Sequence, residues 1–310
     1  MESMFDVAVV GKANLDYLVR GPRLPSPGQS VNGDAFHEGP GGKGANQAVG
    51  AARLGARVAL VARVGADARG ETVLAALIRE GIDVRHVLRD ASAPTGVALC
   101  QVGGSGEKQI LSAAGANARL TAQHVRAAGD ILGAARVVLV QLGIPLEAVT
   151  EAVRLGRAAG AKIVLDPGSP VTLPDALLAQ LDLIRPNASE AEALTGVRVH
   201  DRSSALRAAA ELLRRGAKAA AVQAGEHGDL LVSAEGELWL PRFEVARVDA
   251  TGAGDAFASA FAVALSEGLS LARCGPFASA AAALATTVLG AQASLPRRVA
   301  VLQLIEQQAR

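Results

Sequence analysis

The chain is poor in aromatic residues, cysteine and net charge, and each shortage makes one class of protein improbable. Aromatic residues form 3% of the 310 residues, and 31 Lys and Arg against 30 Asp and Glu leave a net charge of +1. We therefore expect no nucleic-acid partner, because neither a basic field nor a set of stacking rings is available. Cys100 and Cys274 lack CxxC spacing and indicate neither a disulfide framework nor a zinc site, which favours a reducing, cytoplasmic location.

Long apolar runs are scarce as well. Residues 274–296 carry no charge, but Ala dominates them and Ser, Thr, Gly and Gln interrupt them. We expect a small-residue helix packed against a sheet there, and no membrane partner. The first apolar run ends at Lys12 with no basic residue before it, so we expect no secretory signal.

Short β-branched runs alternate with helical patterns along the chain. The runs cover residues 6–10, 57–64, 97–102, 136–140, 161–165, 181–184 and 219–223. Apolar residues at three- and four-residue spacing predict helices, for example over 71–79, 202–215 and 298–308. This alternation predicts an α/β fold in which helices cover both faces of a parallel sheet.

Two segments interrupt the alternation. Residues 13–40 are rich in Gly and Pro, and residues 94–112 resemble a hairpin. We interpret both as strands of a small accessory sheet that closes over a site as a lid, within one domain covering residues 1–310. The exposed edges of such a sheet favour pairing between two copies, so we expect a homodimer.

The first informative cluster is a glycine-rich loop that leads into a helix, at residues 39–47. Gly42 lets the backbone approach a ligand, Lys43 offers a positive charge, and Asn46 offers both a donor and an acceptor. These groups suit a hydroxyl-bearing or phosphorylated ligand. The loop lacks the Gly-Lys-Ser/Thr ending of a P-loop, and a purely structural turn into a helix is the alternative.

The second cluster covers residues 249–257 and leads into another helix. The backbone N–H groups of Gly252, Ala253, Gly254 and Asp255 would form a nest for an anion at the helix N-terminus. A carboxylate in such a nest either caps the helix or, beside a phosphate, accepts a hydroxyl proton. The residues alone leave both roles for Asp255 open.

In order along the chain, these motifs resemble the ribokinase family of carbohydrate kinases, also called the PfkB family. The resemblance covers essentially the whole chain and includes the segments at 11–16, 115–118, 186–190, 223–228 and 290–292. It implies a doubly wound, mostly parallel sheet with helices on both faces and a small β-sheet lid. It also implies ATP-dependent phosphorylation of a primary hydroxyl, with ribose as the leading acceptor and ribose 5-phosphate as the product.

The resemblance also implies residue roles. Asp255 would be the catalytic base, and Gly252, Ala253 and Gly254 would hold the transferred phosphoryl group. The residues implied for binding the sugar are Asn14, Asp16, Gly42, Lys43, Asn46 and Asp255. The residues implied for binding ATP are Asn187, Gln223, Gly225, Gly228, Gly254 and Ser279.

Two metal sites follow from the same resemblance. Asn187 and Glu190, three residues apart at a predicted helix start, would hold Mg²⁺ through water, although a helix capping box explains the same spacing. A monovalent cation, K⁺ in the first instance, would lie behind the nest. Its implied ligands are the Asp249 side chain and the backbone near Thr251, Ala285, Val288, Gly290 and Ser294.

Two positions depart from the family pattern. Gly143 stands where ribokinases commonly carry a sugar-contacting Glu, and Ala250 stands where a Thr is usual. We expect Gly143 to enlarge and neutralise one wall of the sugar site, which leaves deoxyribose, a nucleoside or another sugar open as the acceptor. A non-catalytic sugar-binding protein is a further alternative. A dinucleotide-binding oxidoreductase is disfavoured because Gly11 is not followed by the Gly-x-Gly-x-x-Gly pattern.

Overall fold

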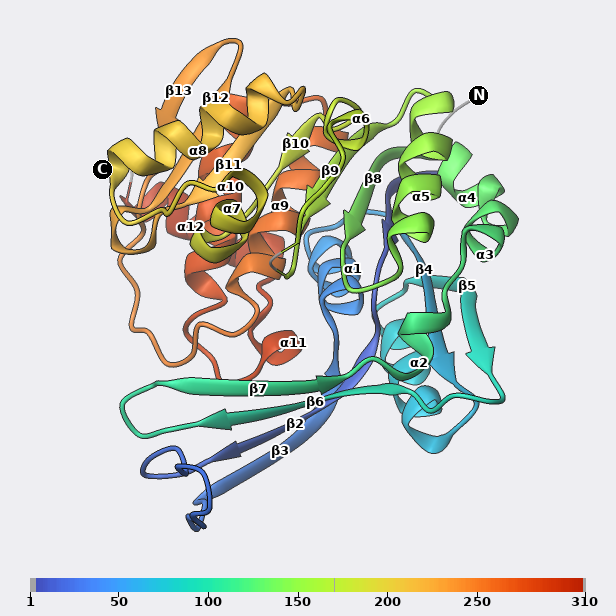
Figure 1. Ribbon diagram of the computed structural model, residues 1–310, viewed down its shortest axis with the longest axis vertical. Coiled ribbons are helices and arrows are strands. Elements are labelled where there is room, and N and C mark those ends of the chain that lie inside the picture. Colours follow the sequence, from blue (N-terminus) through green and yellow to red (C-terminus); the bar gives the residue numbers. More distant parts are fainter. Residues whose placement is uncertain (1–3, 170, 309–310) are drawn as a thin grey trace.

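Two sheets of unequal size organise the chain, which the computed structural model describes over residues 4–169 and 171–308 (Figure 1). The larger sheet contains, in spatial order, β13 (Gly236–Trp239), β12 (Asp229–Ser233), β11 (Ala219–Gln223), β10 (Leu183–Ile184), β9 (Lys162–Asp166), β8 (Ala135–Gln141), β1 (Phe5–Val10), β4 (Val58–Gly65) and β5 (Asp83–Asp90). Its strands run parallel except at β11–β12 and β12–β13, which pair antiparallel. The smaller sheet contains, in order, β3 (Ala35–Gly41), β2 (Asn14–Arg20), β6 (Gly96–Val102) and β7 (Lys108–Ala113).

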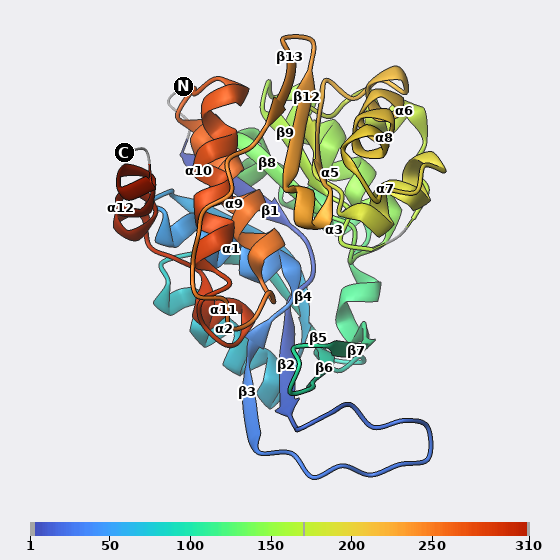
Figure 2. The same ribbon diagram turned by 90° about the vertical axis from the view of Figure 1, so that its left-hand side faces the viewer.

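Helices cover both faces of the larger sheet, as Figure 2 shows. One face carries α1 (Lys43–Arg53), α2 (Ala68–Arg79), α9 (Ala253–Ser266), α10 (Leu271–Leu284) and α12 (Arg298–Gln308). The other face carries α3 (Ala122–Ala127), α4 (Gly129–Gly133), α5 (Leu146–Ala158), α6 (Asp175–Leu178), α7 (Ala188–Thr195) and α8 (Arg202–Arg214). Three short elements complete the chain: η1 (Gly115–Arg119), η2 (Gly225–His227) and α11 (Ala291–Ser294).

The alternation of side chains along each central strand explains why both faces are covered. In β1, Val7 and Val9 enter the core beside α1 and α9, whereas Ala8 and Val10 enter the opposite core. All four side chains are fully buried. A strand that buries both faces must be apolar throughout, which is why it gives a continuous β-branched run in the sequence. The predicted α/β fold with a mostly parallel sheet is confirmed.

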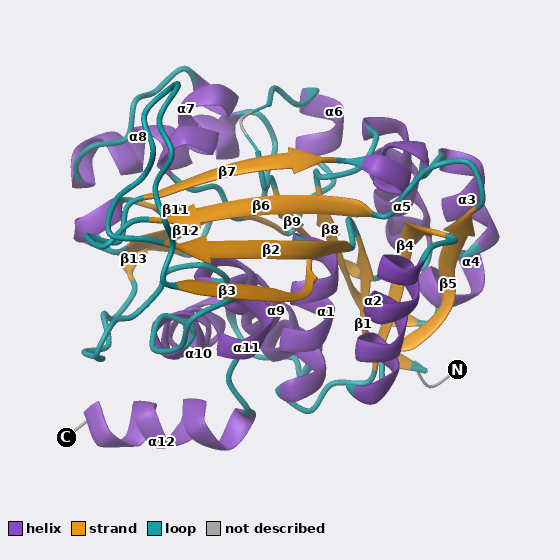
Figure 3. Cartoon of the chain, turned by 90° about the horizontal axis from the view of Figure 1, so that it is seen from below, coloured by secondary structure: helices purple, strands orange, loops and turns teal. Residues whose placement is uncertain are grey.

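The smaller sheet projects from the larger one and is connected to it directly. β2 follows β1 after three residues, pairs antiparallel with β3 and runs parallel to β6, which in turn pairs with β7. Seen from below, these four strands lie across the end of the larger sheet (Figure 3). The smaller sheet therefore faces the carboxyl ends of the central strands, where ligands of open α/β sheets bind.

The hairpin expected over 94–112 is present as β6 and β7 of the smaller sheet, so the run at 97–102 belongs there and not to the larger sheet. Other elements differ from the sequence expectations: β5, β12 and β13 had no clear signal. Residues 274–296 are not one helix: α10 ends at Leu284, and it packs mainly against α9 rather than directly on the sheet. No helix within the described residues has the length and apolar character needed to cross a membrane.

A close backbone approach fixes α1 against the end of β1. A Cβ atom on Gly44 would lie 2.6 Å from the carbonyl carbon of Gly11, and one on Gly11 would lie 3.0 Å from the Cα of Gly44. Gly42, the N-cap of α1, has φ of 85°, which strongly favours glycine. The glycines of this loop thus place the first turn of α1 directly beside the sheet.

We predict that Gly44→Ala lowers the free energy of unfolding by about 1–3 kcal/mol, because the new methyl group must displace backbone atoms. Gly133→Ala at the end of α4 is the matched control, since no atom lies within 4 Å of its added Cβ. Urea unfolding of both variants measures the difference. Equal stabilities of the two variants would contradict the predicted close packing.

Candidate active site

A cleft of about 930 Å³ opens between the smaller sheet and the carboxyl edge of the larger one. Every residue that the sequence associated with the sugar or with ATP lines it: Asn14, Asp16, Gly42, Lys43, Asn46, Asn187, Gln223, Gly225, Gly228, Gly254, Asp255 and Ser279. Gly252, Ala253 and Glu190 line it as well. Segments from the whole length of the chain therefore share one cavity.

Asp255 lies in the first turn of α9 and is held by α1. Its Oδ2 accepts a hydrogen bond from Asn46 Nδ2 at 2.9 Å, and its Oδ1 accepts one from Gln47 Nε2 at 3.0 Å. Burial raises the pKa of Asp255, Lys43 opposes this, and the negative charge of Asp166 adds to it. The carboxylate is consequently oriented, desolvated and more basic than an exposed Asp, as suits a proton acceptor.

Lys43, the first residue of α1, pairs with a carboxylate that the sequence did not single out. Its Nζ lies 3.4 Å from Asp166 at the end of β9, and the Asp166 side chain is fully buried. Burial would lower the pKa of Lys43, but Asp166, Asp255 and Glu190 outweigh it and raise that pKa. Lys43 therefore stays protonated at the junction of the two halves of the cleft.

The N-terminus of α9 provides donors for an anion. Gly252 is the N-cap with φ of 88°, and no side chain caps this helix end. Arg185, which the sequence did not indicate, lies beside it: a Cβ atom on Gly254 would be 2.8 Å from its guanidinium. Arg185 is 4% exposed, and its guanidinium stacks over Phe257 at 4.9 Å. A guanidinium and uncapped N–H groups in one place suit phosphate oxygens.

The half of the cleft where the sugar is expected, which we call the acceptor half, is built on β2. Asn117, from η1, donates to Asn14 Oδ1 at 2.9 Å and to the Ala13 carbonyl at 3.1 Å, and its own Oδ1 accepts from Ala13 N–H. These bonds fix Asn14, and the motif at 115–118 was their sequence signal. Burial raises the pKa of Asp16 to about 6, against the opposing charge of Lys12. Asp16 Oδ1 is buried and meets no donor among the described residues, so it can accept from a ligand hydroxyl.

The wall at Gly143 differs from the expectation. A Cβ atom there would lie 2.5 Å from Cδ of Lys12 and 2.6 Å from Oε1 of the buried Gln141. The aliphatic part of Lys12 thus occupies the space that a missing side chain was expected to leave, and Lys12 itself lines the cleft. The expectation of an enlarged, neutral wall was wrong, because a side chain from the β1–β2 connection fills the space.

The half of the cleft where ATP is expected, which we call the nucleotide half, brings together the ends of β10 and β11. Asn187 is the N-cap of α7 and forms a reciprocal capping box with Glu190: Asn187 Oδ1 accepts from Glu190 N–H, and Glu190 Oε2 accepts from Asn187 N–H, both at 2.9 Å. The helix capping box, the alternative explanation of this spacing, is thus present in the structure. Both side chains nevertheless line the cleft. Gly225 begins η2 and Gly228 follows it, with φ of 58° and 90°.

The loop at Asp249 lies behind the nest. Asp249 Oδ1 accepts from the N–H and hydroxyl of Thr251, and its Oδ2 accepts from Gly290 N–H at 3.0 Å. These bonds outweigh the opposing effect of burial and hold the pKa of Asp249 below its usual value. The Asp249 carboxylate and the neighbouring carbonyls would offer oxygen ligands to a K⁺ ion.

Of the remaining predicted ligands of K⁺, some lie close to the Asp249 loop and one does not. Ser294 N–H donates to the Gly290 carbonyl at 3.1 Å, and the Thr286 carbonyl, next to Ala285, accepts from Asp249 N–H. Val288 is 45% exposed, and no hydrogen bond among the described residues ties it to the Asp249 loop. The described residues contain no group of three or more His, Cys, Asp or Glu placed to hold a metal ion.

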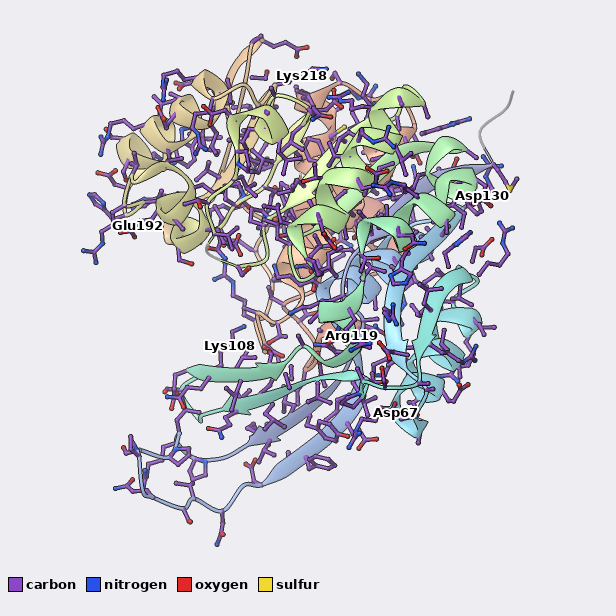
Figure 4. All side chains as sticks on the ribbon, turned by 45° about the vertical axis from the view of Figure 1, so that its right-hand side comes forward. Asp67, Lys108, Arg119, Asp130, Glu192 and Lys218 are labelled. Carbon is purple, nitrogen blue, oxygen red and sulfur yellow. The ribbon has the colours of Figure 1, made fainter. Side chains whose placement is uncertain are left out.

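One side chain of the smaller sheet reaches across the cleft. Lys108 lies at the start of β7, at the mouth of the opening in Figure 4, and its Nζ is 3.3 Å from Thr251 Oγ1. The smaller sheet therefore touches the loop that leads into α9. This contact brings a positive charge to the side of the cleft where the N-terminus of α9 lies.

The site has the features of an α/β enzyme, a buried carboxylate beside an uncapped helix N-terminus that suits an anion, and comparison with known proteins agrees. The family model described as pfkB family carbohydrate kinase matches residues 4–298. The ribokinase of Haemophilus influenzae is 38% identical over 301 residues, covering 97% of this chain and 98% of that one. The deoxyribokinase of Salmonella typhi is 33% identical over 258 residues, covering 83% and 84%.

A solved structure leads to the same family. The structure of Arabidopsis thaliana ribokinase complexed with ribose and ATP matches with a TM-score of 0.88 and 32% identity, covering 99% of both chains. The protein belongs to the pfkB family of carbohydrate kinases. The family expected from the motifs is confirmed.

We predict that Gly252→Ala weakens ATP binding about tenfold, because the added Cβ would lie 2.9 Å from the Ala291 carbonyl and would displace the nest. Gly268→Ala, just past the other end of α9, is the matched control: its φ is 79° and no atom lies within 4 Å. Titration calorimetry with ATP measures both. Equal affinities would contradict the role of the α9 N-terminus.

Proposed function

We propose that the protein is an ATP-dependent ribokinase that transfers the γ-phosphoryl group of ATP to the primary hydroxyl of ribose and releases ribose 5-phosphate and ADP. One observation carries the proposal. One cleft contains three features that the reaction needs: the unpaired acceptor oxygen of Asp16 for a sugar hydroxyl, the carboxylate of Asp255 for a proton, and the uncapped N-terminus of α9 for a phosphate. The ribokinase relatives support ribose as the acceptor.

The acceptor binds against β2 and the first turn of α1. Asp16 accepts hydrogen bonds from sugar hydroxyls, while Asn14 and Asn46 supply donors and acceptors on either side. Gly42 adds a backbone surface without a side chain, which lets a ring approach closely. This arrangement orients a polyhydroxylated ring so that one hydroxyl group points at Asp255.

Transfer then depends on positioning and on charge. Asp255 accepts the proton of the attacking hydroxyl group as its oxygen bonds to the γ-phosphorus and the bond to the β-phosphate oxygen breaks. The N–H groups of residues 252–255 donate to the phosphoryl oxygens, and Lys43 and Arg185 balance the growing negative charge. The low dielectric of the buried site strengthens each of these interactions.

Both metal ions belong to this proposal. We propose that Asn187 and Glu190 hold Mg²⁺ through water molecules, which would neutralise phosphate charge during transfer. Burial raises the pKa of Glu190, with Lys43 opposing, so these residues suit an indirect contact rather than a closed carboxylate cage. We also propose that K⁺ activates the enzyme from the Asp249 loop, where a fixed cation would steady the nest.

The smaller sheet acts in this proposal as a lid and as a dimer contact. Its outer side chains include the exposed Phe36, Leu99 and Leu111, the last of them 73% exposed. Pairing of two lids in a homodimer would cover such surface. Two free, buried cysteines are consistent with the cytoplasmic location that we propose.

We predict that the protein phosphorylates ribose in preference to deoxyribose, nucleosides and hexose phosphates when ATP consumption is followed with Mg²⁺ and K⁺. Asp255→Asn should lower kcat about 10²–10⁴-fold while ATP still binds, because only the proton acceptor is removed. If the unmodified protein turned over no member of the panel, a sugar-binding function would replace the kinase. Retained turnover in Asp255→Asn would refute the proposed base.

We also predict that ribose slows hydrogen exchange of residues 14–20 and 96–113, because the lid closes over the bound sugar. Exchange followed by mass spectrometry, with and without ribose, measures this effect. Strands β9 and β11 serve as internal references that should not respond. Protection of the lid that is complete without sugar would argue against closure.

A further inference from the structure

A second buried carboxylate lies beside the base, and neither the acceptor site nor the phosphate site described above requires it. Asp166 ends β9 with a fully buried side chain. Gln47 Nε2 donates to Asp166 Oδ2 at 2.7 Å and to Asp255 Oδ1 at 3.0 Å. The side-chain amide of Gln47 therefore donates to two carboxylates from different parts of the chain.

The two partners of Asp166 lie on the same face of α1. Lys43 and Gln47 are four residues apart, about one helical turn, and both approach Asp166. Lys43 Nζ is 3.4 Å from each Asp166 oxygen. The same helix face also carries Asn46, which donates to the other oxygen of Asp255. Asp166 thus fixes the helix turn that in turn fixes the base.

We propose that Asp166 is a positioning residue for phosphoryl transfer: through Gln47 and Lys43 it orients the Asp255 carboxylate and keeps it ready to accept the hydroxyl proton. This inference rests on the proposed kinase function and deepens it. Asp166 touches neither the acceptor nor ATP in this mechanism. It acts through the amide and the ammonium group that lie between it and the reacting atoms.

The charged groups around Asp255 determine in which direction its pKa should change when Asp166 is replaced. Lys43 from α1 favours its ionised form, whereas Asp166 and Asp16 of β2 disfavour it. Arg185 and Glu190 lie close enough to act on Lys43 in turn. The other elements packed on α9 place their charged residues away from this edge: Asp6 and Arg136 begin β1 and β8, and Arg273 lies in the first turn of α10.

Replacement of Asp166 by its neutral isostere removes a like charge but keeps an acceptor for Gln47. In Asp166→Asn, the acidic limb of the pH profile of kcat/KM should move to lower pH by roughly one unit, because Asp255 loses its proton more readily. Maximal kcat should fall about tenfold, with KM for ATP within about threefold, because positioning rather than binding is impaired.

Removal of the bridging amide should act in the opposite direction. Gln47→Met keeps the volume but takes a hydrogen-bond donor away from the ionised carboxylate of Asp255, so the acidic limb should move to higher pH. Loss of packing would not by itself move the limbs of two variants in opposite directions. Opposite shifts are therefore the signature of the proposed chain of contacts.

Asp182→Asn is the matched control. Asp182 is also a buried aspartate of the larger sheet, but it pairs with Arg157 and Lys218 just before β10, at the opposite edge. The pH profile of kcat/KM in Asp182→Asn should match that of the unmodified protein. Unchanged limbs in Asp166→Asn, or shifts of the same sign in Asp166→Asn and Gln47→Met, would overturn the proposal. A tenfold higher Mg²⁺ requirement in Asp166→Asn with an unmoved limb would overturn it too, by assigning Asp166 to the metal.

A readout without turnover separates this inference from the proposed function. Carbon-13 NMR titration of Asp side chains, with the Asp255 signal assigned by its loss in Asp255→Asn, should show the pKa of Asp255 lower in Asp166→Asn and higher in Gln47→Met. An unmodified protein that phosphorylates no sugar would refute the kinase function alone. Unchanged Asp255 titration in an active enzyme would refute the role of Asp166 alone.

Discussion

The burial of Asp255 is the constraint on which the architecture of the site depends. A carboxylate removed from water costs several kcal/mol unless hydrogen bonds and opposite charge compensate it. Here the compensation comes from α1, some two hundred residues earlier in the chain: Asn46 and Gln47 donate to the two oxygens. The first turns of α1 and α9 must therefore meet at the carboxyl edge of the larger sheet. The glycines around Gly42 and Gly252 are consequences, because only a backbone without side chains lets both turns lie at the cleft.

The same edge separates two kinds of chemistry. The acceptor half presents the oxygens of Asp16 and Asn14, which suit the hydroxyl hydrogens of a sugar. The donor half presents N–H groups and the cationic Arg185, which suit phosphate. Asp255 and Lys43 lie at the boundary. In the proposed reaction, the proton and the phosphoryl group therefore cross this boundary in opposite directions.

Some of this was readable from the sequence and some was not, for physical reasons. β1 and β8 bury both faces and so give uninterrupted apolar runs, and glycine loops before α1 and α9 mark where backbone must approach a ligand. β5 is an edge strand of the larger sheet and carries five charged or imidazole side chains among eight residues, so no apolar pattern in the sequence indicates it. Asp166 gave no motif, and Gln47 ended the motif at 39–47 without a role of its own, because the role of both arises from one contact between α1 and β9. The sequence did not indicate a role for Arg185 either, because its partners Phe257 and Asp229 are remote from it in the sequence.

The exchange of space between Lys12 and Gly143 couples two positions that are far apart along the chain. An acidic side chain introduced at 143 would meet the aliphatic part of Lys12, so the Lys12 side chain would have to move aside or be shortened. The two positions share one space, so the effects of substitutions at them are expected not to add. Laboratory evolution toward a new acceptor should therefore begin from libraries that randomise both codons at once.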